Sequence, residues 1–217
     1  MMKTRKGFTL ADGIAQFCRY PSPWMIAAVL TGAVTARILV GDWQWTDAVV
    51  PLAMVAAFPF FEWVVHVIIL HWRPLAFGGV RIDPLLAREH RKHHADPRRV
   101  DLIFIPWRAL PWVLAGSIAI ALLAFPRPAL GLTFLSFLMI LALGYEWTHY
   151  LVHTDYKPRS ALYRAVWRNH RLHHFKNERY WFTVTSAGTA DRVFGTYPDP
   201  AAVSTSPTAK NLHALSG

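Results

Sequence analysis

The chain has 217 residues, of which 53% are apolar and only 17% are charged, whereas soluble domains carry about 25% charged residues. This composition favours a membrane protein over a soluble globular enzyme. The formal net charge of +10 would suit a nucleic-acid-binding protein if the chain were hydrophilic. Because it is not, we expect a membrane surface, and no nucleic acid, as the anionic partner. The single cysteine, Cys18, excludes a disulfide framework, a cysteine-ligated zinc site and an intrinsic iron–sulfur cluster.

Four apolar runs qualify as membrane-spanning helices, because about 20 mainly apolar residues cross a bilayer core of roughly 30 Å. They cover residues 23–40, 48–70, 109–125 and 128–145. Arg37 lies near the end of the first run, where we expect its long side chain to reach the interface. Short links at 41–47 and 126–127 join the runs into two hairpins that point the same way. The sequence therefore predicts an all-α integral membrane fold with four transmembrane helices in two hairpins.

Lysine and arginine residues are unevenly distributed between the two sides of these hairpins. Four precede the first run, eight lie in residues 71–108 and nine follow residue 153, whereas the two short links contain only Arg127. Positively charged residues in short loops are retained in the cytoplasm, so we expect a multi-pass protein with both termini and the long middle loop in the cytoplasm. A cleaved signal peptide fits less well, because the first apolar run begins only at residue 23.

No internal repeat of 20 to 50 residues divides the chain. We expect a basic cytoplasmic N-terminal segment at 1–22 and a single membrane domain at 23–197. The last residues, 198–217, are rich in Pro, Ser, Thr and Ala, and this composition predicts a disordered tail.

Ten of the eleven histidines fall into four compact clusters, and only His213 stands apart. The cluster patterns are H-x4-H, H-x2-H-H, H-x3-H and H-x2-H-H, formed by His66 and His71; His90, His93 and His94; His149 and His153; and His170, His173 and His174. Residues three or four apart lie on one face of a helix, so each of the last three clusters presents its imidazoles to one point. His66 and His71 are about 140° apart on an ideal helix. They share a site only if the helix ends or distorts near Leu70.

All four clusters lie at or beyond the cytoplasmic ends of the predicted spans, so they can meet at one place. Ten neutral nitrogen ligands are too many for one ion, but two ions would receive five each and keep an open position for oxygen or substrate. Imidazole suits iron, copper, nickel or zinc, so ligand type alone does not identify the metal.

A membrane metalloprotein without oxygenase activity is the alternative from a different class. Paired histidines at the end of a membrane helix suit bis-histidine haem ligation, whereas adjacent histidine pairs outside the spans do not. A metal transporter would place polar groups midway across the bilayer, where this sequence has only Ser, Thr and Gly.

Two carboxylates accompany the histidines along the apolar runs. Glu62 lies four residues before His66, and Glu146 lies three residues before His149, so each shares a helical face with imidazoles. An ionisable group inside a membrane helix is costly and usually functional. We expect each carboxylate to accept the free ring N–H of a metal-binding histidine, with direct metal coordination as the alternative.

At this point the sequence resembles the fatty acid hydroxylase and sterol desaturase superfamily of integral membrane di-metal oxygenases. Its histidine motifs occur in order as H-VIIL-H, H-RK-HH, H-YLV-H and H-RL-HH, beginning at His66, His90, His149 and His170. The clusters are separated by 18, 54 and 16 residues, which is similar to the fatty acid and ceramide 2-hydroxylase branch. The segment DRVFGT, from Asp191 to Thr196, is similar to one that often closes the catalytic region. The resemblance covers residues 45–197.

The resemblance implies a four-helix membrane base and a helical cytoplasmic cap that holds two metal ions, taken to be iron, with the ten clustered histidines as ligands. It also implies that the reduced iron pair activates dioxygen, that hydrogen is abstracted from an unactivated C–H bond, and that hydroxyl returns to the carbon while the second oxygen atom leaves as water. Zinc has no redox chemistry, so zinc found in a preparation would replace the working iron ions.

The two electrons needed for each turnover require an external donor. Several eukaryotic members of the superfamily carry a fused cytochrome b5 domain, and we expect that this chain has no room for one. A separate ferredoxin, cytochrome b5-like protein or reductase would then dock on a basic face formed by Arg88, Arg91, Lys92, Arg98 and Arg99. Phospholipid headgroups are the commoner partner of such a patch.

The sequence thus predicts a membrane-bound lipid monooxygenase of the fatty acid hydroxylase type. The spacing of the clusters favours a fatty-acyl or sphingolipid-like substrate that is attacked near its polar end. Within the superfamily, carotenoid ring hydroxylation and sterol desaturation or methyl oxidation are the alternatives. The sequence does not separate hydroxylation from desaturation, since both begin with the same hydrogen abstraction.

Overall fold

A computed structural model describes residues 8–213 of the chain. Three of the basic residues predicted for the N-terminal segment, Lys3, Arg5 and Lys6, lie outside the described residues, as do residues 214–217 of the predicted tail. The elements are, in chain order, α1 (Leu10–Phe17), α2 (Pro21–Val40), the 3-10 turn η1 (Trp45–Ala48), α3 (Val49–Val64), the π-helical segment η2 (Val65–Leu70), β1 (Leu75–Phe77), β2 (Val80–Ile82), α4 (Leu85–Ala95), the 3-10 turn η3 (Val100–Leu102), α5 (Leu110–Leu123), α6 (Pro128–His153), α7 (Ala161–Phe175), α8 (Thr189–Val193) and the 3-10 turn η4 (Pro200–Ala202).

The starts of the principal helices follow from local sequence. Pro21 and Pro128 occupy the first turns of α2 and α6, where a backbone N–H has no partner within the helix and a fixed φ is favourable. Ser160 caps α7 by accepting a hydrogen bond from the Tyr163 amide. The long helix α6 has no internal proline or charged residue before Glu146, so it continues through His149 and His153.

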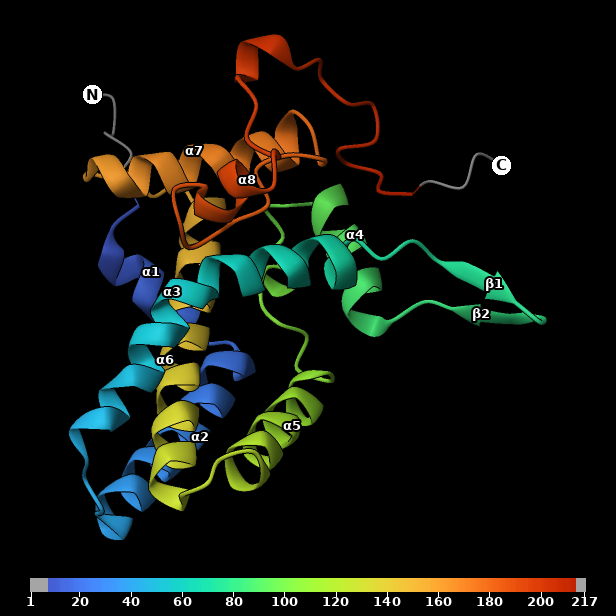
Figure 1. The fold of residues 1–217 in the computed structure, drawn as a ribbon. Coiled ribbons are helices and arrows are strands. Elements are labelled where there is room, and N and C mark those ends of the chain that lie inside the picture. Colours follow the sequence, from blue (N-terminus) through green and yellow to red (C-terminus); the bar gives the residue numbers. More distant parts are fainter. Residues whose placement is uncertain (1–7, 214–217) are drawn as a thin grey trace.

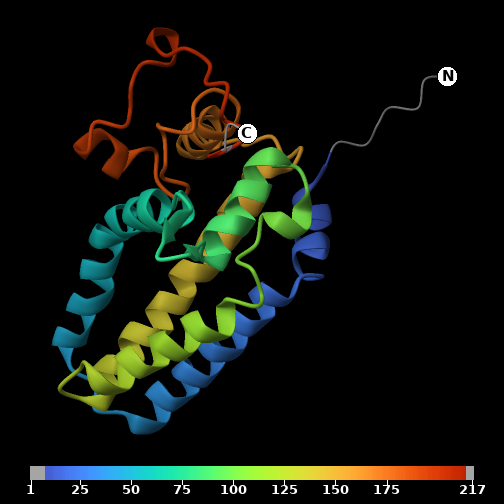
Figure 2. The ribbon, with the colours of Figure 1, turned by 90° about the vertical axis from the view of Figure 1, so that its right-hand side faces the viewer.

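Helices α2, α5 and α6 form the base of the molecule (Figures 1 and 2). Their shared core consists of Ile26, Ala33, Leu110, Leu114, Ala121, Leu135 and Met139. Helices α5 and α6 approach closely, since a Cβ atom added to Gly131 would lie 1.9 Å from the carbonyl oxygen of Ala121. On their outer surfaces the base helices expose large apolar side chains, including Leu39 at 80% and Leu123 at 84%. A surface of this kind is suited to contact with lipid.

Three of the four predicted membrane helices are long and apolar enough to cross a bilayer: Pro21–Val40, Trp45–Leu70 and Pro128–His153. The fourth, α5, has 14 residues and is therefore about 21 Å long, shorter than the bilayer core of about 30 Å. Pro126 disfavours a helical conformation for Phe125, and the chain leaves the helix at Ala124 to form the link to α6. The sequence predicted four full spans, whereas residues 8–213 contain three and one shorter helix.

The second predicted span is bent. Pro59 lies inside α3, and a proline within a helix removes a backbone hydrogen bond and kinks the helix. In Figure 1 the first part of α3 rises beside α6, whereas the later part, with η2, turns across the upper end of α6. This change of direction brings the residues around His66 over the other helices.

The two links between the membrane helices lie at the same end of the molecule, here called the link end (Figure 1). Arg127 pairs with Asp42 and Asp47, and Arg37 donates to Asp47 at 2.8 Å and to Thr133. The Arg37 side chain is only 4% exposed, so it does not extend to an interface as the sequence predicted. A charged partner is available in the following link, and pairing with it stabilises a buried arginine.

At the opposite end, here called the histidine end, α4, α7 and the segments after α7 cover the base (Figure 2). The residues that the sequence assigned to a disordered tail are part of this layer up to His213. Ala209 and Leu212 are buried, and the amide of Ser206 donates to the carbonyl of Lys176 at 2.7 Å. Residues 198–213 thus have defined contacts, which differs from the expectation of a disordered tail, because composition does not reveal side chains that fit an existing surface.

Candidate metal centre

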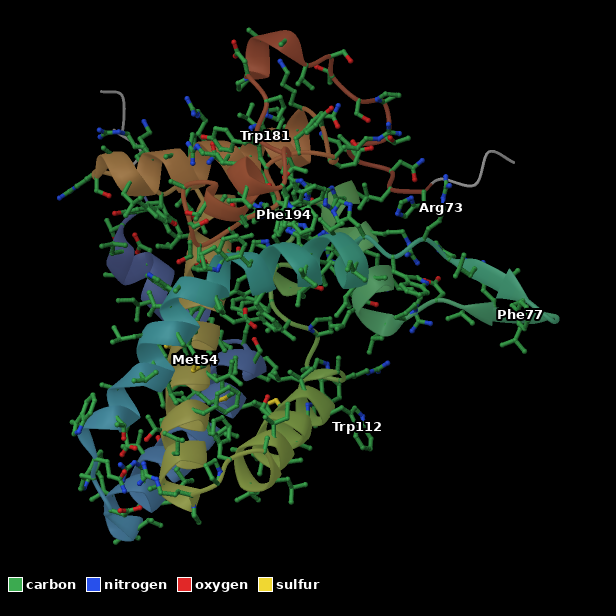
Figure 3. The ribbon with its side chains drawn as sticks, in the orientation of Figure 1. Met54, Arg73, Phe77, Trp112, Trp181 and Phe194 are labelled. Atoms are coloured by element: carbon green, nitrogen blue, oxygen red, sulfur yellow. The ribbon has the colours of Figure 1, made fainter. Side chains whose placement is uncertain are left out.

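The four histidine clusters meet at the histidine end of α6. They come from η2 and the residue after it, from α4, from the last turns of α6 and from α7 (Figure 1). All ten clustered histidines are buried except His71, which is half-buried. The segment after α7, which carries Trp181 and Phe194, covers this region (Figure 3). Histidines that are up to about a hundred residues apart in the sequence thus lie together at one place.

Of the two alternatives that would let His66 and His71 share a site, an end or a distortion of the helix near Leu70, the structure has the distortion, as η2. In this π-helical segment the amide of His71 donates to the carbonyl oxygen of His66 at 2.9 Å, five residues earlier. This wider turn brings the two imidazoles onto the same side, with ring centroids 5.0 Å apart. Single π turns inside helices are frequent at functional sites. His66 and His71 consequently belong to one group of histidines.

The ten imidazoles form two groups of five. Within each group the five ligand nitrogens all lie within 4.8 Å of one another. The first group is His66, His71, His90, His94 and His173, and the second is His93, His149, His153, His170 and His174. His94 and His174 connect the groups, with ring centroids 4.1 Å apart. Each group takes residues from at least three of the clusters, so the sequence clusters do not correspond to separate sites.

The spacing of the Nε2 atoms within each group fits a bound metal ion. In the first group the Nε2 atoms of His66 and His94 are each 3.1 Å from that of His90. In the second group the Nε2 atom of His170 lies 3.0 Å from those of His153 and His174. Two nitrogens bound at right angles to a metal about 2.1 Å from each are about 3.0 Å apart. Both groups therefore have the donor type and spacing of a metal site.

The remaining ring nitrogens differ between the two groups. In the first group the Nδ1 atoms of His66, His94 and His173 donate to the carbonyl oxygens of Phe182, Ala209 and Tyr180, at 2.6, 2.8 and 2.8 Å. In the second group the Nδ1 atoms of His93, His170 and His174 are buried, and no hydrogen-bond partner lies within reach among residues 8–213. A carbonyl partner fixes the tautomer and ring orientation, so the first group is the more rigidly held.

Burial keeps the histidines of α4 and α7 in the neutral form that binds metals. Burial lowers the pKa of His94 to about 3. Burial, reinforced by neighbouring imidazoles, also lowers the pKa values of the other five histidines on these helices far below their usual range: His90, His93, His170, His173 and His174. A neutral imidazole is the state that coordinates a metal.

Glu62 is buried beside the first group, and within residues 8–213 its hydrogen bonds go to backbone amides and a hydroxyl rather than to a histidine. Its carboxylate accepts hydrogen bonds from the amides of Val184 and Thr185 and from the Thr185 hydroxyl, the last at 2.7 Å. This differs from the expectation that it binds the ring N–H of a histidine. The carboxylate fixes the segment after Phe182, whose carbonyl oxygen in turn accepts from His66. The carboxylate binds a backbone segment more than a hundred residues further along the chain. Helical spacing alone does not reveal such a partner.

Glu146 departs from the expectation in the same way. It is fully buried, and its Oε1 atom accepts a hydrogen bond from the amide of Ile105 at 3.0 Å. The amide belongs to the irregular segment between η3 and α5, which packs against Tyr150 through Ile103 and Phe104. Glu146 thus fastens this segment to α6 beneath the second group.

Two further sets of residues support the first group and were missed as site residues. Asp191, in the DRVFGT segment, accepts from the amides of Phe182 and Thr183 at 2.9 and 3.0 Å and from the Thr196 hydroxyl at 2.7 Å. The motif itself was the signal for Asp191. The carbonyl oxygens of Tyr180, Phe182 and Ala209 have no such signal, because every residue carries one.

Comparisons with known proteins agree with this arrangement. A family model described as fatty acid hydroxylase matches residues 51–196. The chain is 31% identical over 158 residues to the dihydroceramide fatty acyl 2-hydroxylase of Arabidopsis thaliana, and the match covers 69% of this chain and 62% of that protein. The chain therefore spans less than two thirds of the length of this relative.

The fold is similar to that of full-length Scs7p, of which only the hydroxylase domain is visible. The two share a TM-score of 0.64 and 18% sequence identity, and the match covers 92% of this chain and 70% of the other. The resemblance drawn from the order and spacing of the histidine motifs is confirmed by the family model and by the curated relative. The chain belongs to the fatty acid hydroxylase family.

Proposed function

We propose that the chain is a membrane-bound, dioxygen-dependent hydroxylase that acts on an unactivated C–H bond of a fatty-acyl or sphingolipid-like substrate. The observation that carries the proposal is the pair of five-histidine groups in contact at the end of apolar helices. The match to a dihydroceramide fatty acyl 2-hydroxylase supports the same class of substrate. Hydroxylation of carotenoid rings or oxidation of sterols is the alternative within the wider superfamily.

The ten clustered histidines would hold two metal ions, one in each group. The donor set and the Nε2 spacing of 3.0–3.2 Å fit ions of this kind. Iron is proposed because the reaction is a redox reaction and zinc has no redox chemistry. When bound, a reduced iron pair supplies the activation of dioxygen and the abstraction of hydrogen from carbon. The electrons would come from an external donor.

The protein's own contribution is to hold the imidazoles and exclude water. Glu62 and Asp191 fix the backbone from Phe182 to Thr185, and the Phe182 carbonyl oxygen orients His66. The Phe182 ring lies over the first group, 5.2 Å from the His173 ring and 5.4 Å from the His71 ring. A closed apolar cover of this kind keeps bulk water from a reactive centre.

An apolar cavity between α3 and α6 is the proposed site of the acyl chain. It has a volume of about 380 Å³ and lies beside Phe58, Pro59, Gly144, Tyr145 and Thr148. Lipid-binding pockets are largely apolar and usually of a few hundred Å³. The Tyr145 ring lies 5.6 Å from the ring of His149 in the second group. A chain in this cavity would therefore end next to the proposed metal ions.

We place α2, the bent α3–η2 helix and α6 across the bilayer, with the histidine end at the cytoplasmic face. Of the 23 Lys and Arg residues in the sequence, only Arg37 and Arg127 belong to the segments at the link end. The other 21 belong to the N-terminal segment, to residues 71–108 and to the residues after His153, and positive residues in such segments are retained in the cytoplasm. A separate redox partner would then approach from the cytoplasm. Much of the predicted basic face is already paired within the chain, since Arg91 binds Asp83, Lys92 binds Glu89 and Arg99 binds Asp101.

The test is a lipid mass-spectrometry comparison in a host that supplies fatty acids, sphingolipids, carotenoids and a suitable reductase. Cells expressing the wild-type chain are compared with cells expressing His173→Ala and with cells expressing Arg168→Ala, a control at an exposed position of the same helix. Lipids that gain one oxygen atom in the wild type and the control, but not in His173→Ala, would support the proposal and identify the substrate class. Loss of two hydrogens would instead make the protein a desaturase. Unchanged lipids, with both metal ions bound, would contradict the proposal.

A further inference from the structure

The hairpin β1–β2 projects sideways from the rest of the molecule (Figure 1). Its strands pair antiparallel, and Gly78 and Gly79 form the two-residue turn with φ values of +57° and +80°. Two-residue turns with positive φ match the twist of the strands, and glycine adopts them without strain. All six strand residues are exposed. A single two-stranded hairpin is marginally stable at best in water, so this one requires a surface that covers it.

The hairpin has two chemically different faces. The pairs Leu75–Ile82 and Phe77–Val80 lie on one face, because residues two apart in a strand point the same way. The remaining pair, Ala76–Arg81, lies on the other face. The apolar face is exposed at every position: Leu75 by 48%, Phe77 by 81%, Val80 by 64% and Ile82 by 44%. This is a continuous apolar patch with a basic reverse side.

The place of the hairpin identifies the covering surface. Figure 1 shows it beyond the outline of the base helices, on the side of the molecule where α5 lies and above the start of that helix. Trp107 and Trp112, at the start of α5, are 57% and 80% exposed, and Figure 3 shows Trp112 on the same side of the molecule as Phe77. Exposed tryptophans are enriched where a membrane meets water. The apolar face thus continues the lipid-facing surface of the base.

Basic side chains complete the pattern expected at a membrane interface. Arg81 lies on the reverse face with 61% of its side chain exposed, and Arg73 precedes the hairpin at its root (Figure 3). Acyl chains suit the apolar face, and headgroup phosphates suit arginines above it. A protein partner would leave unexplained why the patch lies on the same side of the molecule as the exposed Trp112 (Figure 3).

We propose that the β1–β2 hairpin lies in the membrane interface at the histidine end, with Leu75, Phe77, Val80 and Ile82 toward the acyl chains and Arg81 toward the phosphates. The occupant of the apolar face is phospholipid. The proposal rests on the membrane placement given under the proposed function, but it requires no metal and no turnover. In this position the hairpin acts as a side anchor that fixes the depth of η2 and α4, which flank it in sequence.

The test measures the depth of single residues in the full-length chain. Cys18 is exposed and is the only cysteine, so Cys18→Ser provides a background without thiols. Phe77→Cys and the matched control Ala76→Cys are each labelled with a small environment-sensitive fluorophore. The proteins are placed in lipid nanodiscs that hold one copy each. Quenching by iodide in water and by lipids carrying a shallow spin label is then measured, and Val80→Cys and Arg81→Cys repeat the comparison on the other strand.

The proposal expects alternation between adjacent residues. Labels at 77 and 80 are quenched by the lipid-borne group and are severalfold less sensitive to iodide than labels at 76 and 81. Equal access of iodide to all four positions would show that the hairpin is in water and would overturn the proposal. Protection at 77 that arises only when a disc holds two copies would assign the face to a second chain, which also overturns it. Hydroxylase activity does not enter the readout, so failure here leaves the proposed function untouched.

Discussion

The Nδ1 atom of His94 lies 2.8 Å from the carbonyl oxygen of Ala209, 115 residues further along the chain. Because a carbonyl oxygen can only accept, the contact places the ring proton on Nδ1 and leaves Nε2 free for a metal. Next to it the Nε2 atom of His213 donates to the carbonyl oxygen of His71 at 2.9 Å. Residues 206–213 therefore cover the first histidine group and hold one of its rings in place.

Replacing Leu212 by Asp should weaken metal binding by the first group. Leu212 is 5% exposed, and burying an unpaired carboxylate there is costly enough to detach the segment from the surface. Loss of a partner that orients a metal-binding imidazole typically lowers metal affinity by roughly 10- to 100-fold. The measurement is metal content per chain after dialysis against increasing concentrations of a chelator.

Asn211→Asp is the matched control, since it introduces the same carboxylate at an exposed neighbouring position. It should retain metal like the wild type, whereas Leu212→Asp should lose about half of its metal at a chelator concentration that leaves the wild type loaded. Equal retention by both variants would show that residues 206–213 do not support the centre.

The metal-free protein should lose stability as the pH falls below about 6.5, the ordinary pKa of histidine. Burial lowers the pKa values of six histidines on α4 and α7, that of His94 to about 3. The unfolded chain therefore binds more protons than the folded chain between about pH 6.5 and the lowered values, so acid favours unfolding there by up to about 1.4 kcal/mol per pH unit for each histidine.

Thermal unfolding of the metal-free protein in detergent at pH 7.5, 6.5 and 5.5 measures this effect. Most of the loss should occur between pH 6.5 and 5.5, and a His170→Gln variant should show a shallower dependence because one titrating group is gone. A midpoint that stays constant down to pH 5.5 would be incompatible with neutral, buried histidines.

The sequence was sufficient to identify the histidines and three of the membrane helices, because both leave recognisable patterns. Histidines spaced three and four residues apart mark one face of a helix, and apolar runs mark helices in lipid. The spacing of His66 and His71 required the helix to end or distort near Leu70 if the two share a site, and the structure has a distortion there, η2. The sequence did not predict the division into groups, in which the neighbours His93 and His94 belong to different sets.

The contacts that hold the centre were beyond sequence reasoning, because they involve backbone atoms that converge only in the folded chain. Glu62 and Glu146 were recognised as significant from their cost in a membrane helix. Their partners are amides of Val184, Thr185 and Ile105 rather than imidazoles. A carboxylate that accepts from backbone amides has no spacing rule, so only the structure could identify those partners.

Gly131→Ala should destabilise the packing of α5 on α6. The added Cβ atom would lie 1.9 Å from the Ala121 carbonyl oxygen, so the helices must separate. Overpacking of this kind costs about 1–3 kcal/mol, more than the roughly 1 kcal/mol that alanine gains over glycine in a helix. Denaturant unfolding in mixed micelles measures the change.

Gly116→Ala on α5 is the control, because its Cβ atom would meet no atom within 4 Å. That variant should be as stable as the wild type or slightly more stable. If both alanine variants unfold at the same denaturant concentration, the close approach of α5 and α6 is not required for stability.

Gly144→Leu should restrict the length of the acyl chain that the enzyme accepts. Gly144 lines the apolar cavity between α3 and α6, and a Cβ atom added there meets no atom within 4 Å. The leucine side chain can therefore extend into the cavity without displacing protein atoms, and it occupies space proposed for the acyl chain. Each methylene group of a substrate that no longer fits an apolar pocket costs about 1–3 kcal/mol of transition-state binding, which corresponds to about tenfold or more in kcat/KM. We expect kcat/KM to fall by at least about tenfold for long acyl chains and to change little for short ones.

The measurement is competition between acyl chains of different length in one reaction, with the hydroxylated products resolved by mass spectrometry. Gly32→Leu is the matched control, because it lies on α2, is exposed and has no atom within 4 Å of its Cβ position. Metal content should equal that of the wild type in both variants, since neither residue belongs to a histidine group. A uniform loss of activity at every chain length would indicate damage to the centre rather than a shortened cavity. An unchanged preference would show that the acyl chain does not enter between α3 and α6.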